Sequence, residues 1–114
     1  MNDCIAIIPA RGGSKRIPKK NIKIFCGKPM IYYSIKNAIS SSCFKKVIVS
    51  TDNDDIARIS KKYGAEILFK RPKNLSTDKA LTRDVVNHTI GFLDKLGEEF
   101  KYACLIYPTA PLLQ

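Results

Sequence analysis

The chain has 114 residues, of which 45% are hydrophobic and 26% charged, and its formal net charge is +10. This composition is that of one ordinary globular domain, and it excludes collagen-like, low-complexity and disordered chains. No apolar run approaches the roughly 20 residues that span a bilayer, and Asp3 stands where a signal peptide carries basic residues, so we expect a cytoplasmic protein without a membrane partner.

The first predicted element is a strand at residues 4–9 (CIAIIP), a short apolar run with β-branched residues that is typical of a strand buried on both faces. Residues 10–21 (ARGGSKRIPKKN) follow as a loop with two glycines and five basic side chains. Residues 1–46 carry ten basic residues and one acid, whereas the remaining residues carry ten and nine. The excess charge therefore belongs to this end of the chain, where it predicts an anion-binding loop.

Two amphipathic helices and a strand are predicted next along the chain. Residues 28–42 have helical periodicity, with Pro29 suited to the first turn, and residues 46–50 form a second buried strand. The helix predicted within residues 51–65 begins with capping and acidic residues and stops at Gly64. The apolar faces of these helices contain Ile31, Ile35, Ala38 and Ile39 in the first and Ile56, Ile59 and Tyr63 in the second.

The remaining predicted elements are a strand at 65–69 (AEILF), a polar loop, a helix at 82–97 and a strand at about 102–107. The third helix is expected to turn Val85, Val86, Thr89, Ile90, Leu93 and Leu96 toward a core.

This alternation predicts an α/β class, Rossmann-like three-layer nucleotide-binding fold with a mostly parallel sheet. Ligands of such sheets bind beyond the carboxyl ends of the strands, where the polar segments 10–21, 70–78 and 107–111 would meet. We expect residues 1–114 to form a single nucleotide-binding domain. Because the sequence stops directly after a strand, we also expect it to be the N-terminal portion of a larger enzyme, truncated at the C-terminus.

The scattered cysteines and the acidic residues do not predict a metal site within the chain. Zinc-ligand spacing is absent, which indicates free, mostly buried thiols in a reducing compartment. The single histidine, His88, lies inside a predicted helix and is interpreted as structural. Asp52, Asp54 and Asp55 precede a helix, where acids complement the dipole, and we interpret them as capping residues.

The basic loop has the chemistry of a triphosphate site. Gly12 and Gly13 allow backbone amides to turn inward around an anion, and Ser14 adds a hydroxyl donor. Arg11 can hold phosphate oxygens with two donors, and the neighbouring lysines act as mobile charges. The loop matches neither the GxxxxGK[ST] nor the GxGxxG pattern, which disfavours kinase-like and NAD-binding sites.

The same residues resemble a known family. Residues 5–35 (IAIIPARGGSKRIPKKNIKIFCGKPMIYYSI) closely resemble the first motif of the acylneuraminate cytidylyltransferases, the CMP-sialic acid synthetase family, and the similarity continues through 47–67, 71–78 and 107–114. The resemblance implies transfer of CMP from CTP to an acidic nine-carbon α-keto acid sugar, with release of pyrophosphate. It also implies Mg²⁺ held by aspartates beyond residue 114, and a homodimer for the full-length enzyme.

The resemblance assigns roles to individual positions. Arg11 and Lys20 match residues that contact the CTP phosphates and are the expected catalytic pair, while Arg71 matches a position that reads cytosine. Tyr107 replaces the glutamine that faces the sugar in sialic acid synthetases, which looks more like the pseudaminic acid cytidylyltransferases. The implied nucleotide-binding residues are Ala10, Arg11, Gly12, Gly13, Ser14, Lys15, Lys20, Asn21, Arg71, Ala80 and Thr82, and the implied sugar-binding residues are Tyr107 and Thr109.

Three alternatives stay open at this point. The glycine loop also loosely resembles those of other sugar or alcohol nucleotidyltransferases. The net charge would suit a nucleic-acid-binding module, although the sequence offers no aromatic stacking platform, and we expect no nucleic-acid partner. Finally, a 114-residue fragment could bind nucleotide without catalysis, and we expect no CMP-sugar formation from it.

Overall fold

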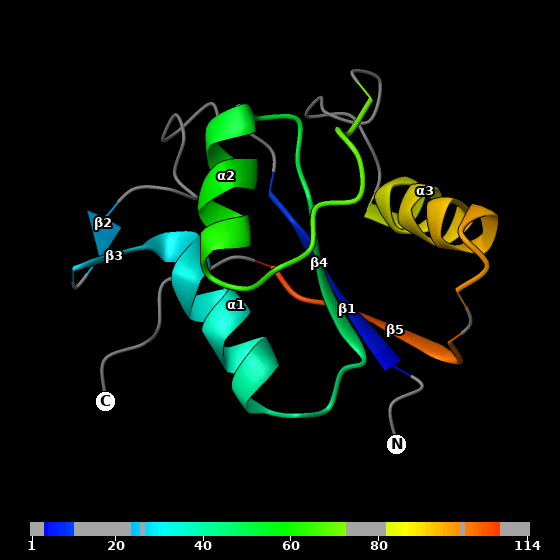
Figure 1. The fold of residues 1–114 in the computed structure, drawn as a ribbon, viewed down its shortest axis with the longest axis horizontal. Helices are drawn as coiled ribbons and strands as arrows, with labels where there is room; N and C mark the ends of the chain where they lie inside the picture. Colours follow the sequence, from blue (N-terminus) through cyan, green and yellow to red (C-terminus); the bar gives the residue numbers. More distant parts are fainter. Residues whose placement is uncertain (1–3, 11–23, 26, 73–81, 99, 108–114) are drawn as a thin grey trace.

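A three-stranded parallel sheet lies at the centre of the computed structural model, which describes residues 4–10, 24–25, 27–72, 82–98 and 100–107 (Figure 1). Its strands are β1 (Cys4–Pro9), β4 (Lys46–Ser50) and β5 (Tyr102–Leu105), in the spatial order β4-β1-β5. In the register of the sheet, Ile7 of β1 pairs with Ile48 on one side and with Leu105 on the other. All three strands therefore end at the same edge.

The strand predicted at residues 65–69 is wrong as an extended element, because only Glu66 pairs with the sheet. Glu66 forms an isolated parallel bridge with Ile48, in which its N–H donates to the Val47 carbonyl at 2.8 Å and its carbonyl accepts from Val49 at 3.0 Å. The segment nevertheless lies beside β4, where the predicted topology puts it. Its next residues, Ile67 and Leu68, pack against the cores on opposite faces of the sheet.

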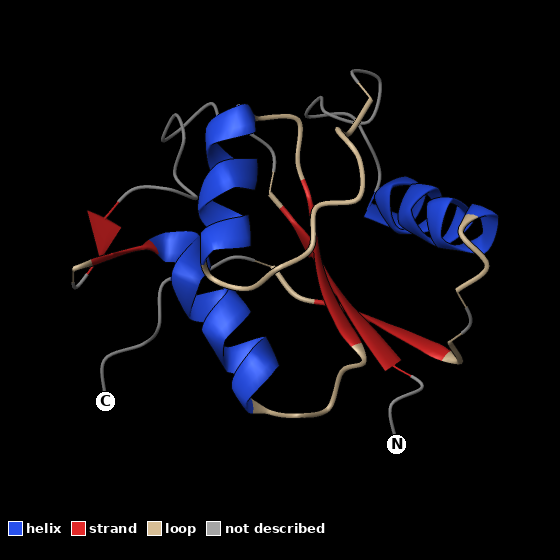
Figure 2. Cartoon of the chain, viewed as in Figure 1, coloured by secondary structure: helices blue, strands red, loops and turns tan. Residues whose placement is uncertain are grey.

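Helices cover both faces of the sheet and give the predicted three-layer, Rossmann-like α/β fold (Figure 2). Helices α1 (Met30–Ser40) and α2 (Asp54–Lys62) lie on one face, and α3 (Thr82–Lys95) lies on the other. Side chains alternate along β1 accordingly. Ala6 and Ile8 join the core under α1 and α2, whereas Ile5 and Ile7 pack with Leu93 of α3.

A short hairpin precedes α1 and was not predicted. Strands β2 (Ile24–Phe25) and β3 (Lys28–Pro29) pair antiparallel across a two-residue connection. Gly27 in this connection has φ +85°, a conformation that glycine adopts without steric cost. Gly27 was the available signal, since two-residue hairpin loops favour glycine. Pro29 is the last residue of β3 and stands directly before Met30, where α1 begins.

Helix α2 has the ends that the sequence predicts. The Asn53 side chain accepts a hydrogen bond from the Ile56 N–H at 3.0 Å and so caps the first turn. Asp54 and Asp55 occupy that turn, and Lys61 and Lys62 occupy the last one, so charges at both ends complement the helix dipole.

Gly64, just beyond α2, provides a stability test. It has φ +103°, and a Cβ there would lie 2.9 Å from the flexible end of Ile39. We expect Gly64→Ala to lower the free energy of unfolding by about 1–2 kcal/mol, because an L side chain is strained in this conformation. Gly91→Ala is the matched control: it lies inside α3 with open space around it, and should raise stability by up to about 1 kcal/mol. Urea unfolding of both variants checks this, and equal midpoints would contradict it.

Two expectations about burial are wrong. Ile39 and Leu96 were expected in the core but are 44% and 56% exposed, since Ile39 lies at the border of its helix face and α3 ends at Lys95, before Leu96. Strand β5 is exposed along most of its length, because it is the edge of the described sheet.

None of the helices in the described ranges is long and apolar enough to cross a membrane.

The cysteines in the described ranges are free, as expected, but not mostly buried. Cys43 and Cys104 are exposed, and Cys4 is half-buried. Burial, together with the neighbouring thiols of Cys104 and Cys43, raises the pKa of Cys4 above its ordinary value. Cys4 is therefore protonated at neutral pH and is a poor nucleophile.

Candidate functional site

The carboxyl ends of β1 and β4 are joined by a hydrogen bond at the edge where the sequence predicts a ligand. Ala10, the first residue after β1, is 1% exposed, and its N–H donates to the Ser50 carbonyl at 2.8 Å. This bond extends the pairing of β1 with β4 by one residue and fixes the point where the basic loop begins. Ala10 is thus held rigidly by the sheet.

Arg71 reaches the same point from a segment some twenty residues further along the chain. Its backbone N–H donates to the Thr51 carbonyl at 2.8 Å. Its side chain donates twice to Ser50, from Nε to Oγ at 3.1 Å and from Nη2 to the carbonyl at 2.7 Å. The residue is 5% exposed, so the guanidinium is buried and its orientation is set by the end of β4.

Ser50 is the junction of this site and was missed by the sequence reasoning. Its carbonyl accepts hydrogen bonds from both Ala10 and Arg71, using both lone pairs, and its side chain is fully buried. The available signal was a polar pair, Ser50 and Thr51, placed directly after a buried strand. The structure therefore brings two of the predicted site residues together through a residue that was not predicted.

The start of α2 forms the next part of this edge. The Thr51 hydroxyl accepts from the Asn53 N–H at 3.1 Å, and Thr51, Asn53 and Lys70 help to line a hollow of about 220 Å³. Asp54 pairs with Lys70 at 3.6 Å, and Asp55 pairs with Arg58 at 3.4 Å. The acids of this first turn thus serve the helix and nearby cations, in agreement with their interpretation as capping residues.

The residues that the structure describes contain no preformed cluster of metal ligands. Across the described ranges, no three histidine, cysteine or acidic side chains come close enough to hold a metal ion. Mg²⁺ prefers several oxygen ligands in an octahedral arrangement. Asp54 and Asp55, in the first turn of α2, are ion-paired with basic side chains.

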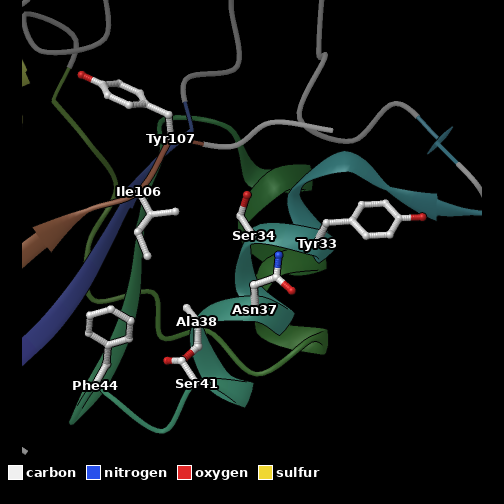
Figure 3. A pocket seen from close by; sticks show the side chains of 8 residues that line it. All are labelled: Tyr33, Ser34, Asn37, Ala38, Ser41, Phe44, Ile106 and Tyr107. Carbon is white, nitrogen blue, oxygen red and sulfur yellow. The ribbon is translucent and has the colours of Figure 1, made fainter. Parts of the chain in front are cut away.

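Tyr107 lies at the rim of a second hollow, of about 250 Å³, between α1 and the chain after β5 (Figure 3). Tyr107 lies two residues beyond β5, and the N–H of its neighbour Ile106 donates to the Ile7 carbonyl at 3.0 Å. Ala38, Phe44 and Ile106 give the hollow its apolar lining, whereas the ring of Tyr107 projects away from α1. Tyr107 is 56% exposed and is therefore accessible from this edge.

Other predicted residues are placed separately or not described. Thr82 is the first residue of α3. His88 packs edge-on against Phe69, with ring centroids 4.5 Å apart, as expected for a structural residue, but its buried Nδ1 has no hydrogen-bond partner among the described residues. The following predicted site residues lie outside the described ranges: Arg11, Gly12, Gly13, Ser14, Lys15, Lys20, Asn21, Ala80 and Thr109.

Comparison with known proteins gives consistent matches. A family model described as Cytidylyltransferase matches residues 5–114. The chain is 50% identical over 109 residues to the pseudaminic acid cytidylyltransferase of Campylobacter jejuni, covering 96% of this chain and 47% of that protein. It is 39% identical over 107 residues to the N-acylneuraminate cytidylyltransferase of Escherichia coli, covering 94% of this chain and 24% of that protein.

A solved structure is also similar. The structure of CMP:2-keto-3-deoxy-manno-octonic acid synthetase complexed with CTP matches with a TM-score of 0.71 and 25% sequence identity, covering 94% of this chain and 43% of that one. This match agrees with the predicted nucleotide-binding α/β fold. The chain spans about half the length, or less, of the curated relatives that it matches.

Proposed function

The chain belongs to the cytidylyltransferase family, and we propose on that basis that it is the nucleotide-binding part of an enzyme that transfers CMP from CTP to a nonulosonic acid, releasing pyrophosphate. The observation that carries the proposal is the junction at Ser50. It joins Ala10, where the basic loop begins, to Arg71, the proposed reader of the base. One edge of the sheet would thus hold both ends of the nucleotide.

We propose a sugar of the pseudaminic acid type as the acceptor. Two observations support this choice over sialic acid. The Campylobacter pseudaminic acid enzyme is 50% identical to the chain, against 39% for the Escherichia coli N-acylneuraminate enzyme. Tyr107, at the exposed rim of the site edge, also replaces a glutamine typical of sialic acid synthetases.

In the proposed mechanism, the anomeric hydroxyl of the sugar attacks the α-phosphorus of CTP in line, and the bond to pyrophosphate breaks. Such transfers depend mainly on positioning and on stabilising the charge of the transferred group. Ala10 anchors the loop whose Arg11 and Lys20 are proposed to neutralise that charge. Magnesium would enter with the triphosphate, and the described residues contain no group of three candidate ligands for it.

The proposal also covers the cellular compartment and the oligomeric state of the full-length enzyme. Three free thiols in the described ranges suit the reducing cytoplasm, where we place the reaction. The family resemblance leads us to propose a homodimer for the full-length enzyme, and a single nucleotide-binding domain for residues 1–114.

Arg11→Ala and Lys20→Ala are expected to weaken CTP binding by about 10- to 100-fold each, because each removes a charge-assisted phosphate contact worth about 1.5–3 kcal/mol. Isothermal titration of CTP measures the change. Lys61→Ala, an exposed lysine at the far end of α2, is the control and should bind CTP as the wild type does. Tighter binding of UTP or GTP than of CTP by the wild type would contradict the proposed function, as would salt-dependent nucleic-acid binding that CTP cannot displace.

A further inference from the structure

Ser50 occupies one complete edge of the Arg71 guanidinium. An arginine side chain carries five N–H donors in a rigid planar fork, and the donors are arranged along edges. Nε and Nη2 form one such edge, and both donate to the same residue, to the Ser50 hydroxyl at 3.1 Å and to its carbonyl at 2.7 Å. The paired contact fixes the plane of the fork as well as its position.

Ser50, which holds Arg71, is itself held in place by the sheet. Ser50 is fully buried, pairs with Pro9 of β1 at the end of the sheet, and receives the Ala10 N–H on its carbonyl. The carbonyl is therefore fixed by the backbone, and the hydroxyl is the only contact to Arg71 that a side-chain substitution removes. Without the hydroxyl, the Nε–Nη2 edge of the guanidinium keeps only one of its two contacts to Ser50.

The orientation of the guanidinium plane decides whether Arg71 can distinguish cytosine from uracil. Cytosine presents two adjacent acceptors, O2 and N3, whereas uracil carries a hydrogen on N3. Two parallel donors on the Nη1–Nη2 edge of an arginine therefore match cytosine and oppose uracil, provided that the fork holds the required angle. The Nη1–Nη2 edge of Arg71 adjoins the Nε–Nη2 edge that donates to Ser50, so the two contacts to Ser50 set its direction.

We propose that Ser50 is a positioning residue for nucleotide selection: its hydroxyl orients Arg71 so that the site prefers CTP over UTP. The inference rests on the proposed function, in which Arg71 reads the base. Ser50 does not touch the nucleotide in this scheme and acts only through Arg71. Removing the Ser50 hydroxyl should therefore change the ratio of the affinities for CTP and UTP. It should have a smaller effect on the part of the affinity that comes from the triphosphate, which both nucleotides carry.

The test compares Ser50→Thr with Ser50→Val in the full 114-residue chain. The two side chains have nearly the same shape, so both place the same extra methyl group in a buried position, and they differ only in the hydroxyl. Dissociation constants for CTP and UTP are measured by isothermal titration. We expect the threonine variant to keep the wild-type ratio of the UTP and CTP dissociation constants. In the valine variant this ratio should fall by about tenfold, which is the effect of one hydrogen bond to a charged group.

Ser60→Ala is the control for deleting a buried serine hydroxyl. Ser60 is fully buried in α2, its hydroxyl has no hydrogen-bond partner, and its loss should leave the CTP-to-UTP ratio unchanged. Equal ratios in the threonine and valine variants would overturn the role of Ser50 while leaving the proposed function intact. A wild-type chain that binds CTP no better than UTP would overturn the proposed function, and the inference with it.

Discussion

Replacing Arg71 with alanine is expected to weaken CTP binding by at least about 100-fold, because two charge-assisted hydrogen bonds of about 1.5 kcal/mol or more each disappear from the proposed base contact. Arg71→Lys should be nearly as defective, since lysine keeps the charge but lacks the planar fork held by Ser50. Equilibrium titration with CTP and UTP measures both effects. The lysine variant should also lose the preference for CTP.

Arg58→Ala is the control for the loss of an arginine. Arg58 lies on the exposed side of α2, where its side chain is 74% exposed and its guanidinium pairs with Asp55 at 3.4 Å. Exposed pairs of this kind contribute about 1 kcal/mol or less, and CTP binding should not change. A lysine variant that binds CTP with wild-type affinity and selectivity would show that Arg71 does not read the base.

Ile48→Ala is expected to lower the free energy of unfolding by about 3–4 kcal/mol, within the range of 2–5 kcal/mol that such core truncations cost. Ile48 is fully buried at the middle of β4, where it packs with Ile5, Ile7 and Leu93 between the sheet and α3. Since small domains are stable by about 5–15 kcal/mol, the loss would be a large part of the total. Urea unfolding followed by circular dichroism measures it.

Ile39→Ala makes the same chemical change at a surface position and serves as the reference. Ile39 is 44% exposed on α1, and its truncation should cost about 1 kcal/mol or less, in part because alanine favours the helix. If the two variants unfolded at the same urea concentration, Ile48 would not be the core residue that its burial indicates.

Much of the fold is predictable because many of its elements depend on local sequence patterns. The apolar run at residues 4–9 and the capped, charge-punctuated helix Asp54–Lys62 form as expected. Local signals fail where pairing or burial depends on distant partners. The apolar residues 65–69 contribute one bridge, Ile39 lies outside the core, and Tyr102 is 67% exposed on the edge strand β5.

For the candidate site, the sequence is enough to predict the chemical groups: a glycine-rich basic loop after a buried strand, an arginine in a polar segment, and their common edge in a parallel sheet. How Ala10 and Arg71 are joined depends on the tertiary structure. Both donate to Ser50, which lies forty residues after one and twenty-one before the other. A hydrogen bond between residues so far apart follows from strand pairing and register, and no local pattern records it.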